Sequence, residues 1–202
     1  TVSDNNLTTV ADGGGYGIYL GSGSGAEISG NVLESISGNG IYINSNADNG
    51  VISNNTLTSI TSSSYGIYVG SGSDSLTVNN NNLENIIGQG IYFYSGNALE
   101  MSNNSIINSS NTAIYISGSS SSCIVSGNLI QGGSGNGIYL NSSVTYTNIS
   151  GNEITGKNSE GIKLDYYCNY TVIDSNLVSG NSYGIYLYEN NDNVDITNNT
   201  IA

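Results

Sequence analysis

The sequence predicts an all-β fold, a right-handed single-stranded parallel β-helix of about eight coils, each with about 24 residues and three short strands. Three observations lead to this prediction. A Gly-Ile-Tyr-apolar tetrad recurs along the chain, an asparagine motif recurs in step with it, and clusters of Gly, Asn and Ser separate the apolar segments. We expect residues 1–202 to form a single domain of this kind, either a segment of a longer solenoid or a polymerising subunit.

The tetrad predicts one strand of each coil and the direction in which its side chains point. Its first copy begins at Gly17 and its last at Gly184, with AIYI at Ala113 and GIKL at Gly161 as variants, and successive copies lie 23 to 26 residues apart. Because side chains alternate across a strand, the Ile of each copy should point inward and the following residue outward. The expected inward ladder is Ile18, Ile41, Ile67, Ile91, Ile114, Ile138, Ile162 and Ile185. The expected outward stripe is Tyr19, Tyr42, Tyr68, Tyr92, Tyr115, Tyr139 and Tyr186, with Lys163 in the GIKL coil.

The asparagine motif predicts a ladder of stacked amides at one turn. It reads apolar, polar, any residue, Asn, any residue, apolar, and no copy breaks the pattern. Each amide can hydrogen bond to its equivalent one coil along, so we assign these side chains a structural role and no chemistry. The asparagines of the motif are Asn5, Asn31, Asn55, Asn81, Asn104, Asn128, Asn152, Asn176 and Asn199.

Three β segments should fill each period, typified by residues 26–29, 32–36 and 40–43. These segments are too short and too rich in β-branched residues for helices, and turn-forming residues separate them. Each segment should pair in parallel with its equivalent in the next coil, at about 4.8 Å per coil.

This repeat resembles the right-handed parallel β-helix family, which includes pectate lyases, polygalacturonases and surface repeat proteins of archaea and bacteria. Pectate lyases use an Arg base and calcium-binding Asp residues, and polygalacturonases use several Asp with supporting His, Arg or Lys. The chain has neither His nor Arg, because its two basic residues are Lys157 and Lys163. The catalytic residues that the resemblance implies therefore find no match, and we expect a non-enzymatic protein without catalytic residues.

A hydrolase that uses paired carboxylates remains chemically open, because two acids are sufficient for it. The acids of this chain are scattered, however. Glu27, Glu100 and Asp195 share an outward column on non-adjacent coils, and Glu34 and Glu84 share another column two coils apart. This spacing argues against a convergent pair.

The net charge of −13 argues against nucleic acid, an anionic membrane or a polyuronate as a partner, because these ligands require clustered Lys and Arg. No apolar run is long enough to span a bilayer. Oxygen-rich turns at residues 44–50 and 188–195 make calcium conceivable, but neither matches a calcium-loop motif. We therefore expect no cofactor and assign no metal site.

Two features could bind a partner. The tyrosine stripe is explained by self-stacking, by contact with a neighbouring subunit or by stacking of sugars. The GIKL coil and the loop after it depart from the repeat and are the first place to look for a ligand. The residues of this irregular segment are Lys163, Asp165, Tyr166, Tyr167 and Tyr170.

The two cysteines and the glycosylation motifs bear on the compartment. Cys123 is expected to point inward and Cys168 to lie in a loop two coils later, about 10 Å away along the axis and too far for an undistorted disulfide. The alternative is a disulfide formed through a distorted loop. Asn-x-Ser/Thr motifs permit N-glycosylation at Asn6, Asn54, Asn103, Asn108, Asn141, Asn148, Asn169 and Asn198.

The leading functional hypothesis is an extracellular or cell-surface structural protein that self-assembles into a fibre, sheath or surface layer, or forms a solenoid stalk. The alternative is a carbohydrate-binding or carbohydrate-active β-helix. Both ends of the chain, TVSDNNLTTV and DITNNTIA, read as repeat without a cap. We therefore expect further polypeptide or copies of the chain to cover them, with end-to-end contacts and lateral contacts through the tyrosines, and glycans as a further partner.

Overall fold

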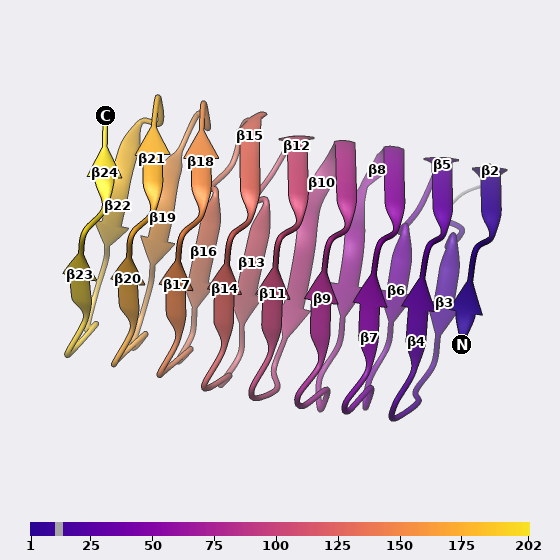
Figure 1. Ribbon diagram of the computed structural model, residues 1–202, viewed down its shortest axis with the longest axis horizontal. Coiled ribbons are helices and arrows are strands. Elements are labelled where there is room, and N and C mark those ends of the chain that lie inside the picture. The colour runs from indigo at the N-terminus through magenta and orange to yellow at the C-terminus, as the bar shows by residue number, and fades with distance from the viewer. Residues whose placement is uncertain (11–13) are drawn as a thin grey trace.

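The structure, a computed structural model, describes residues 1–10 and 14–202, and these residues form a stack of β coils without helices. Figure 1 shows the coils lying side by side from the indigo N-terminus to the yellow C-terminus. Each strand pairs in parallel with its equivalent one coil away, as in Val2↔Ile28 and Ile41↔Ile67. This is the predicted solenoid.

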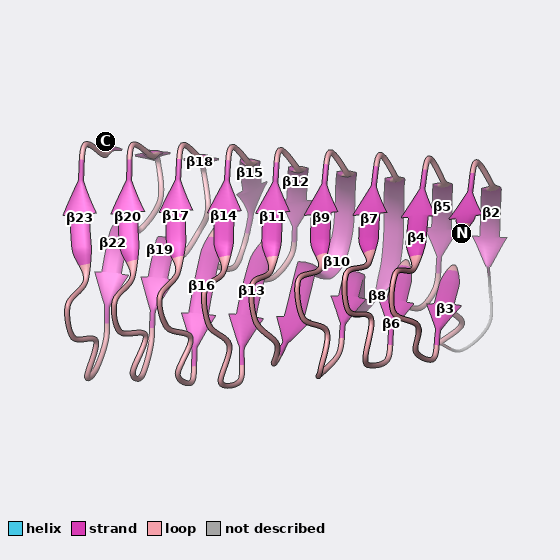
Figure 2. Cartoon of the chain, turned by 60° about the horizontal axis from the view of Figure 1, so that its bottom comes forward, coloured by secondary structure: helices cyan, strands magenta, loops and turns pink. Residues whose placement is uncertain are grey.

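One face is a nine-stranded sheet built from the segments that precede the ladder asparagines. Figure 2 presents these strands in a row at the front. They are β1 (Val2–Ser3), β4 (Glu27–Ser29), β7 (Val51–Ser53), β9 (Thr77–Asn79), β11 (Glu100–Ser102), β14 (Ile124–Ser126), β17 (Asn148–Ser150), β20 (Val172–Asp174) and β23 (Asp195–Thr197).

The other two faces join into a 15-stranded sheet. The segments after the asparagines are β2 (Asn6–Val10), β5 (Val32–Ile36), β8 (Thr56–Val69), β10 (Asn82–Tyr94), β12 (Ser105–Ser109), β15 (Leu129–Gly133), β18 (Glu153–Thr155), β21 (Leu177–Ser179) and β24 (Thr200–Ile201). The tetrad segments are β3 (Ile18–Leu20), β6 (Ile41–Ile43), β13 (Ile114–Ser117), β16 (Ile138–Asn141), β19 (Glu160–Leu164) and β22 (Tyr183–Leu187). In β8 and β10 the two segments run together without a break, which is why the two faces count as one sheet.

The core consists of stacked apolar columns, with the predicted isoleucine ladder among them. Ile41, Ile67 and Ile114 are fully buried, and the fourth residues of their tetrads, Ile43, Val69 and Ile116, are buried as well. Burying one such side chain contributes about 1.5–3 kcal/mol, so a column repeated in every coil supplies much of the stability. A tetrad glycine is needed where coils approach closely, because a Cβ at Gly66 would lie 2.6 Å from the Gly90 carbonyl oxygen.

The asparagine ladder is present and fully hydrogen-bonded through the stack. From Asn5 to Asn176, each side-chain Nδ2 donates to the Oδ1 of the next ladder asparagine at 2.9–3.0 Å, as Asn55 does to Asn81 and Asn104 does to Asn128. The backbone N–H of each asparagine donates to the same Oδ1. Nδ2 also donates to a strand carbonyl of the preceding coil, as in Asn55 to the Ile28 oxygen. The amides therefore satisfy backbone groups that the turn leaves unpaired.

The terminal coils leave their apolar columns partly uncovered. Val2 is 38% exposed, Ile196 is 43% exposed and Ile201 is 54% exposed, whereas the equivalent side chains in inner coils are buried. Ile185, the last member of the isoleucine ladder, is correspondingly only partly buried.

Candidate functional site

The outward tyrosines form a stacked ladder, which we define as Tyr19, Tyr42, Tyr68, Tyr92, Tyr115 and Tyr139. Neighbouring rings are nearly parallel with centroids 4.4 Å apart for Tyr42 and Tyr68 and 4.8 Å apart for Tyr115 and Tyr139. The pair Tyr68 and Tyr92 is the exception and meets edge-on at 5.5 Å. Because stacked rings cover one another's faces, the ladder presents mainly ring edges and hydroxyl groups outward.

Additional tyrosines that the tetrad pattern did not single out pack beside the ladder. Tyr65 lies 5.0 Å from Tyr68 and 5.3 Å from Tyr92, where the ladder changes from stacked to edge-on. Tyr16 contacts the first rungs in the same way. Both tyrosines stand immediately before a tetrad glycine, a position that most other coils fill with a different residue type, so no repeating column marked them.

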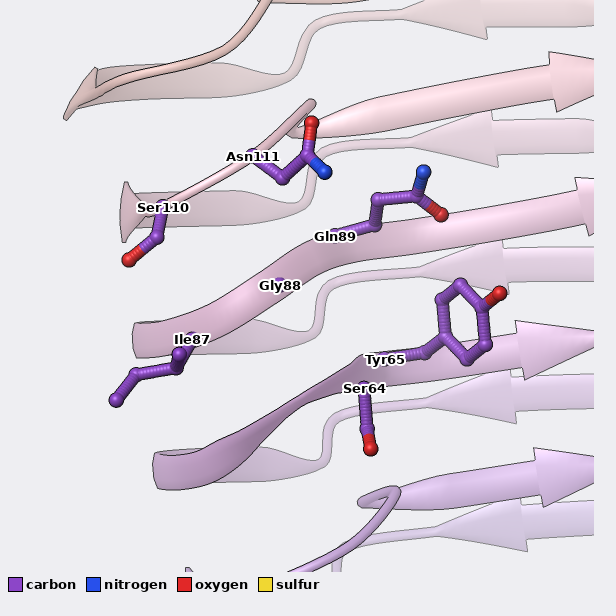
Figure 3. Close-up of a pocket in the computed structure, with 7 residues that line it drawn as sticks. All are labelled: Ser64, Tyr65, Ile87, Gly88, Gln89, Ser110 and Asn111. Carbon is purple, nitrogen blue, oxygen red and sulfur yellow. The ribbon is translucent and has the colours of Figure 1, made fainter.

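A groove of about 320 Å³ opens beside Tyr65. It is lined by Ser64, Tyr65, Ile87, Gly88, Gln89, Ser110 and Asn111, drawn in Figure 3. A second hollow of about 370 Å³ adjoins it, lined by Ser59, Thr61, Asn85, Ile87, Asn108 and Ser110. Ile87 and Ser110 line both hollows, and the Ile87 side chain is 46% exposed.

The groove arises from an irregularity in the coils. Ile86 pairs with Ile60, but Gly88 pairs with Ser64, so the register between β8 and β10 shifts. Gly88 has φ 142°, and a Cβ there would lie 1.8 Å from the Ser64 carbonyl oxygen, so this close approach requires glycine. The only sign of this irregularity in the sequence is the 26-residue spacing between Gly40 and Gly66, which is longer than the spacing in most other coils.

The groove carries polar groups able to bind hydroxyls. Gln89 lines the groove, and the Oε1 of its amide is buried without a hydrogen-bond partner in the described structure. Figure 3 shows Gln89 and Asn111 on neighbouring coils, with Tyr65 beside Gln89. The Asn111 Oδ1 accepts from the Thr112 N–H at 2.8 Å, which fixes the orientation of that amide. Burial raises the pKa of Tyr65, so its hydroxyl stays protonated at neutral pH.

The predicted irregular segment divides into two parts. Lys163 takes a tyrosine position in the ladder, with its Nζ 4.9 Å from the Tyr139 ring centroid and 5.9 Å from that of Tyr186. Its Nζ also lies 3.2 Å from Asp165 Oδ2, which accepts from the Tyr139 hydroxyl at 2.7 Å. Asp165 is 6% exposed, and its Oδ1 has no hydrogen-bond partner in the described structure. Burial and the hydrogen bond to Asp165 raise the pKa of Tyr139, so the phenol stays protonated.

The tyrosines of the loop after β19 make separate contacts. Tyr170 stacks on Tyr146 at 4.7 Å, and Tyr166 meets Tyr188 edge-on at 5.3 Å. Tyr167 is exposed, and Tyr166, Tyr167 and Tyr170 all have positive φ. Tyr188 in turn lies 6.4 Å from Tyr186, which Lys163 contacts, so these two rings join Tyr166 to the lysine–aspartate pair.

Lys157 was not singled out from the sequence and is the least expected residue of the structure. It is 1% exposed, and its Nζ donates to the Ser109 carbonyl oxygen at 3.3 Å, to Ser109 Oγ at 3.2 Å and to the Asn111 carbonyl oxygen at 3.4 Å. Burial lowers the pKa of Lys157 to about 8. The amine holds the turn that carries Ser110 and Asn111, from a position 46 to 48 residues further along the chain.

The acids within residues 1–10 and 14–202 are the candidates for a shared metal site. Among the described residues, no group of three or more His, Cys, Asp or Glu side chains could hold an ion. In the first oxygen-rich turn, Asp48 Oδ1 accepts from the Asp74 N–H at 2.9 Å, and Asp74 Oδ1 in turn accepts from the Asn97 N–H at 2.7 Å. These carboxylates act as turn acceptors between coils.

The cysteine prediction needs one correction. Cys123 and Cys168 are both free and buried, and Cys168 lies in a loop as predicted, so the alternative of a disulfide is wrong. The Cys168 Sγ points inward and lies 2.9 Å from the Asp165 carbonyl oxygen. Burial raises the pKa of both thiols to about 11, which keeps them protonated and unreactive.

The glycosylation motifs differ in accessibility. Asn141 and Asn169 are half-buried, and the other six asparagines are exposed: Asn6, Asn54, Asn103, Asn108, Asn148 and Asn198. Their modification stays a prediction.

Comparison with known proteins places this geometry in a family. Among solved structures, the periplasmic alginate epimerase AlgG superimposes with a TM-score of 0.76 at 14% identity, over 93% of this chain and 47% of that one. The Dettilon tailspike protein superimposes with a TM-score of 0.63 at 13% identity, over 99% of this chain and 52% of that one. The chain therefore spans about half the length of these structures, and at such identities the likeness shows the fold.

No curated protein sequence matches significantly, and no membrane-spanning helix occurs in the described part of the chain. The family described as "right handed beta helix region" matches residues 1–75 and 65–202. Together these matches include every residue of the sequence, and they confirm the fold class and the handedness that the repeat predicts. The chain is a member of the right-handed β-helix family.

Proposed function

We propose that this chain is a carbohydrate-binding β-helix whose site is the groove beside the tyrosine ladder. The observation that supports this most directly is the combination of an aromatic ring, an exposed aliphatic side chain and several neutral polar groups around one hollow. A sugar presents apolar C–H faces and a ring of hydroxyls, so it is complementary to such a lining.

Each wall of the groove has a role in this proposal. Tyr65 and Ile87 supply apolar surface for the C–H face of a sugar ring. The Gln89 amide and the Ser110 hydroxyl supply donors and acceptors for its hydroxyls.

The ladder contributes as a support and not as the stacking surface. Its rings cover one another, as in Tyr42 on Tyr68 at 4.4 Å, and leave few free faces for a sugar. Tyr65, tilted by 42° from Tyr68, departs from this stacking and lines the groove. The ladder thus holds Tyr65 in place, while Tyr65 meets the ligand.

We propose binding without catalysis. General acid–base chemistry requires a titratable group positioned at the reacting bond. The groove lining contains hydroxyls, amides and an aliphatic side chain, and it contains no carboxylate or amine. The lysine–aspartate cluster at Tyr139 has its charges paired within itself.

The structural neighbours are compatible with this class of ligand. One is named an alginate epimerase, which acts on a polysaccharide, and it is described as periplasmic. The other is named a tailspike. Both descriptions favour a place outside the cytoplasm, and we propose an extracellular or surface location for this chain as well.

Affinity electrophoresis tests the proposal. Native gels containing soluble hydroxyethylcellulose, dextran, mannan or xylan should retard the protein in at least one case. Tyr65→Ala and Gln89→Leu should reduce that retardation. Tyr183→Ala is the matched control, because Tyr183 occupies the same position before a tetrad glycine in the C-terminal coil and lies away from the groove. If no polysaccharide retards the wild type, or if Tyr183→Ala has the same effect as Tyr65→Ala, the groove is not a glycan site.

A further inference from the structure

We infer that the groove selects neutral polysaccharides and rejects polyuronates, so that this chain differs in ligand class from an alginate-processing protein of the same fold. The inference rests on the proposed glycan function and specifies its ligand. It is carried by the positions of the two cationic side chains and by the composition of the groove.

Both cations of the chain are already engaged. The 202 residues contain two basic side chains against fifteen acids. Lys157 is buried, and its amine donates to three oxygen atoms of the turn beneath the groove. Lys163 lies between two tyrosine rings and is paired with Asp165 at 3.2 Å. Neither lysine lines the groove, so neither ammonium meets a carboxylate that enters it.

The groove contains no other group that could offset the loss of hydration of a uronate carboxylate. Its lining is electrically neutral, and the molecule as a whole carries a charge of −13. A carboxylate that enters such a groove loses hydration without gaining a cation, which is unfavourable. It also enters a repulsive field that acts over about one Debye length, roughly 8 Å at physiological salt. A neutral sugar meets neither penalty.

A pair of polymers with one backbone isolates the effect of charge. Hydroxyethylcellulose and carboxymethylcellulose, and dextran and carboxymethyldextran, differ mainly in carboxylate groups. Binding measured by titration calorimetry should favour the neutral member of at least one pair. The difference within that pair should shrink as salt rises from 20 mM to 500 mM, since salt screens the repulsion.

A charge introduced into the groove provides a gain-of-function test. Ser110→Lys places an ammonium on a residue that lines both hollows, and it should strengthen binding of the carboxymethyl polymer by about fivefold. Ser22→Lys adds the same charge to an exposed serine near the N-terminus, outside the groove, and should change binding much less. Far-ultraviolet circular dichroism confirms that each variant is folded.

The outcomes separate this inference from the proposed function. Tighter binding of the carboxymethyl polymer to the wild type, weakened by salt, would overturn the selectivity and leave a glycan-binding groove. An equal gain in affinity for the carboxymethyl polymer in Ser110→Lys and Ser22→Lys would show that the charge within the groove does not determine binding. Failure of every neutral and acidic polymer to bind would remove the proposed function and the selectivity together.

Discussion

The asparagine ladder should be a major source of stability, and removing one amide from its middle tests this. Asn104 Oδ1 accepts from the backbone N–H and the Nδ2 of Asn81, both at 3.0 Å. Its Nδ2 donates to the Val78 carbonyl oxygen at 2.9 Å and to Asn128 Oδ1 at 3.0 Å. Asn104→Ala therefore removes four hydrogen bonds and leaves the buried Asn81 N–H without an acceptor.

The expected cost follows from these bonds. A net contribution of about 1 kcal/mol for each of the four bonds, with a further penalty of about 1–3 kcal/mol for the orphaned backbone N–H, predicts a loss of about 5–7 kcal/mol. This is a large share of the 5–15 kcal/mol that typically separates a folded domain from its unfolded state. Asn104→Leu has a similar volume and lacks the bonds, so it should be destabilised by a similar amount.

Guanidinium unfolding followed by circular dichroism measures the effect. Asn82→Ala is the control, because Asn82 directly follows a ladder asparagine and is exposed. We expect its midpoint to stay close to that of the wild type. If Asn104→Leu regained the stability lost in Asn104→Ala, the ladder would act through packing, and the reasoning from hydrogen bonds would be wrong.

Three further predictions concern the core and the two lysines. Ile114→Asp should destabilise the chain by at least about 4 kcal/mol, because it removes a buried side chain and buries a charge. Ile124→Asp is the control and should be tolerated, because Ile124 is exposed. Equal melting temperatures of Ile114→Asp and the wild type would refute the inward assignment. Trypsin should leave the folded chain intact while cutting the denatured chain, because Lys157 is buried and Lys163 lies within β19; early fragments ending at either lysine would contradict this. Between about pH 8 and pH 10.5 the unfolded chain keeps the Lys157 proton that the folded chain has released, so the free energy of unfolding should rise with pH. The rise should be up to about 3 kcal/mol larger in the wild type than in Lys157→Met. Parallel pH profiles of the two proteins would show that the amine is not buried in solution.

The fold could be predicted because each column repeats one type of side chain at nearly constant spacing. Residues 26–29, 32–36 and 40–43 were expected to be strands, and the structure has Glu27–Ser29, Val32–Ile36 and Ile41–Ile43. The predicted register is also found, since Ile91 pairs with Ile114 and Tyr92 with Tyr115. In a parallel solenoid, the same chemical environment recurs in every coil, so equivalent residues of successive repeats lie next to each other in space.

The groove could not be predicted by the same reasoning, because it exists where the repeat fails. Its lining residues Gln89 and Ser110 belong to no repeating column, and their juxtaposition depends on the register shift after Ile86. Lys157 illustrates the same limit. An isolated lysine in a polar turn is normally expected in solvent, and only the three-dimensional path of the chain brings its amine beneath the Ser109–Asn111 turn.

The two departures from the repeat lead to opposite functional interpretations. Lys163 replaces a ladder tyrosine, and this made its coil the first candidate for a ligand site. In the structure, its ammonium stacks between the rings of Tyr139 and Tyr186 and pairs with Asp165, so the substitution continues the ladder by a cation–π contact. At the β8–β10 irregularity, by contrast, the coils stay paired through Gly88 and Ser64, and a hollow lies beside the register shift. A ligand site needs space as well as polar groups. Asp165 Oδ1 and Gln89 Oε1 both lack partners, but the hollows described above are lined by residues of the second departure and not by Lys163 or Asp165. This difference is the reason that we place the glycan at Tyr65 and Gln89 and not at Lys163.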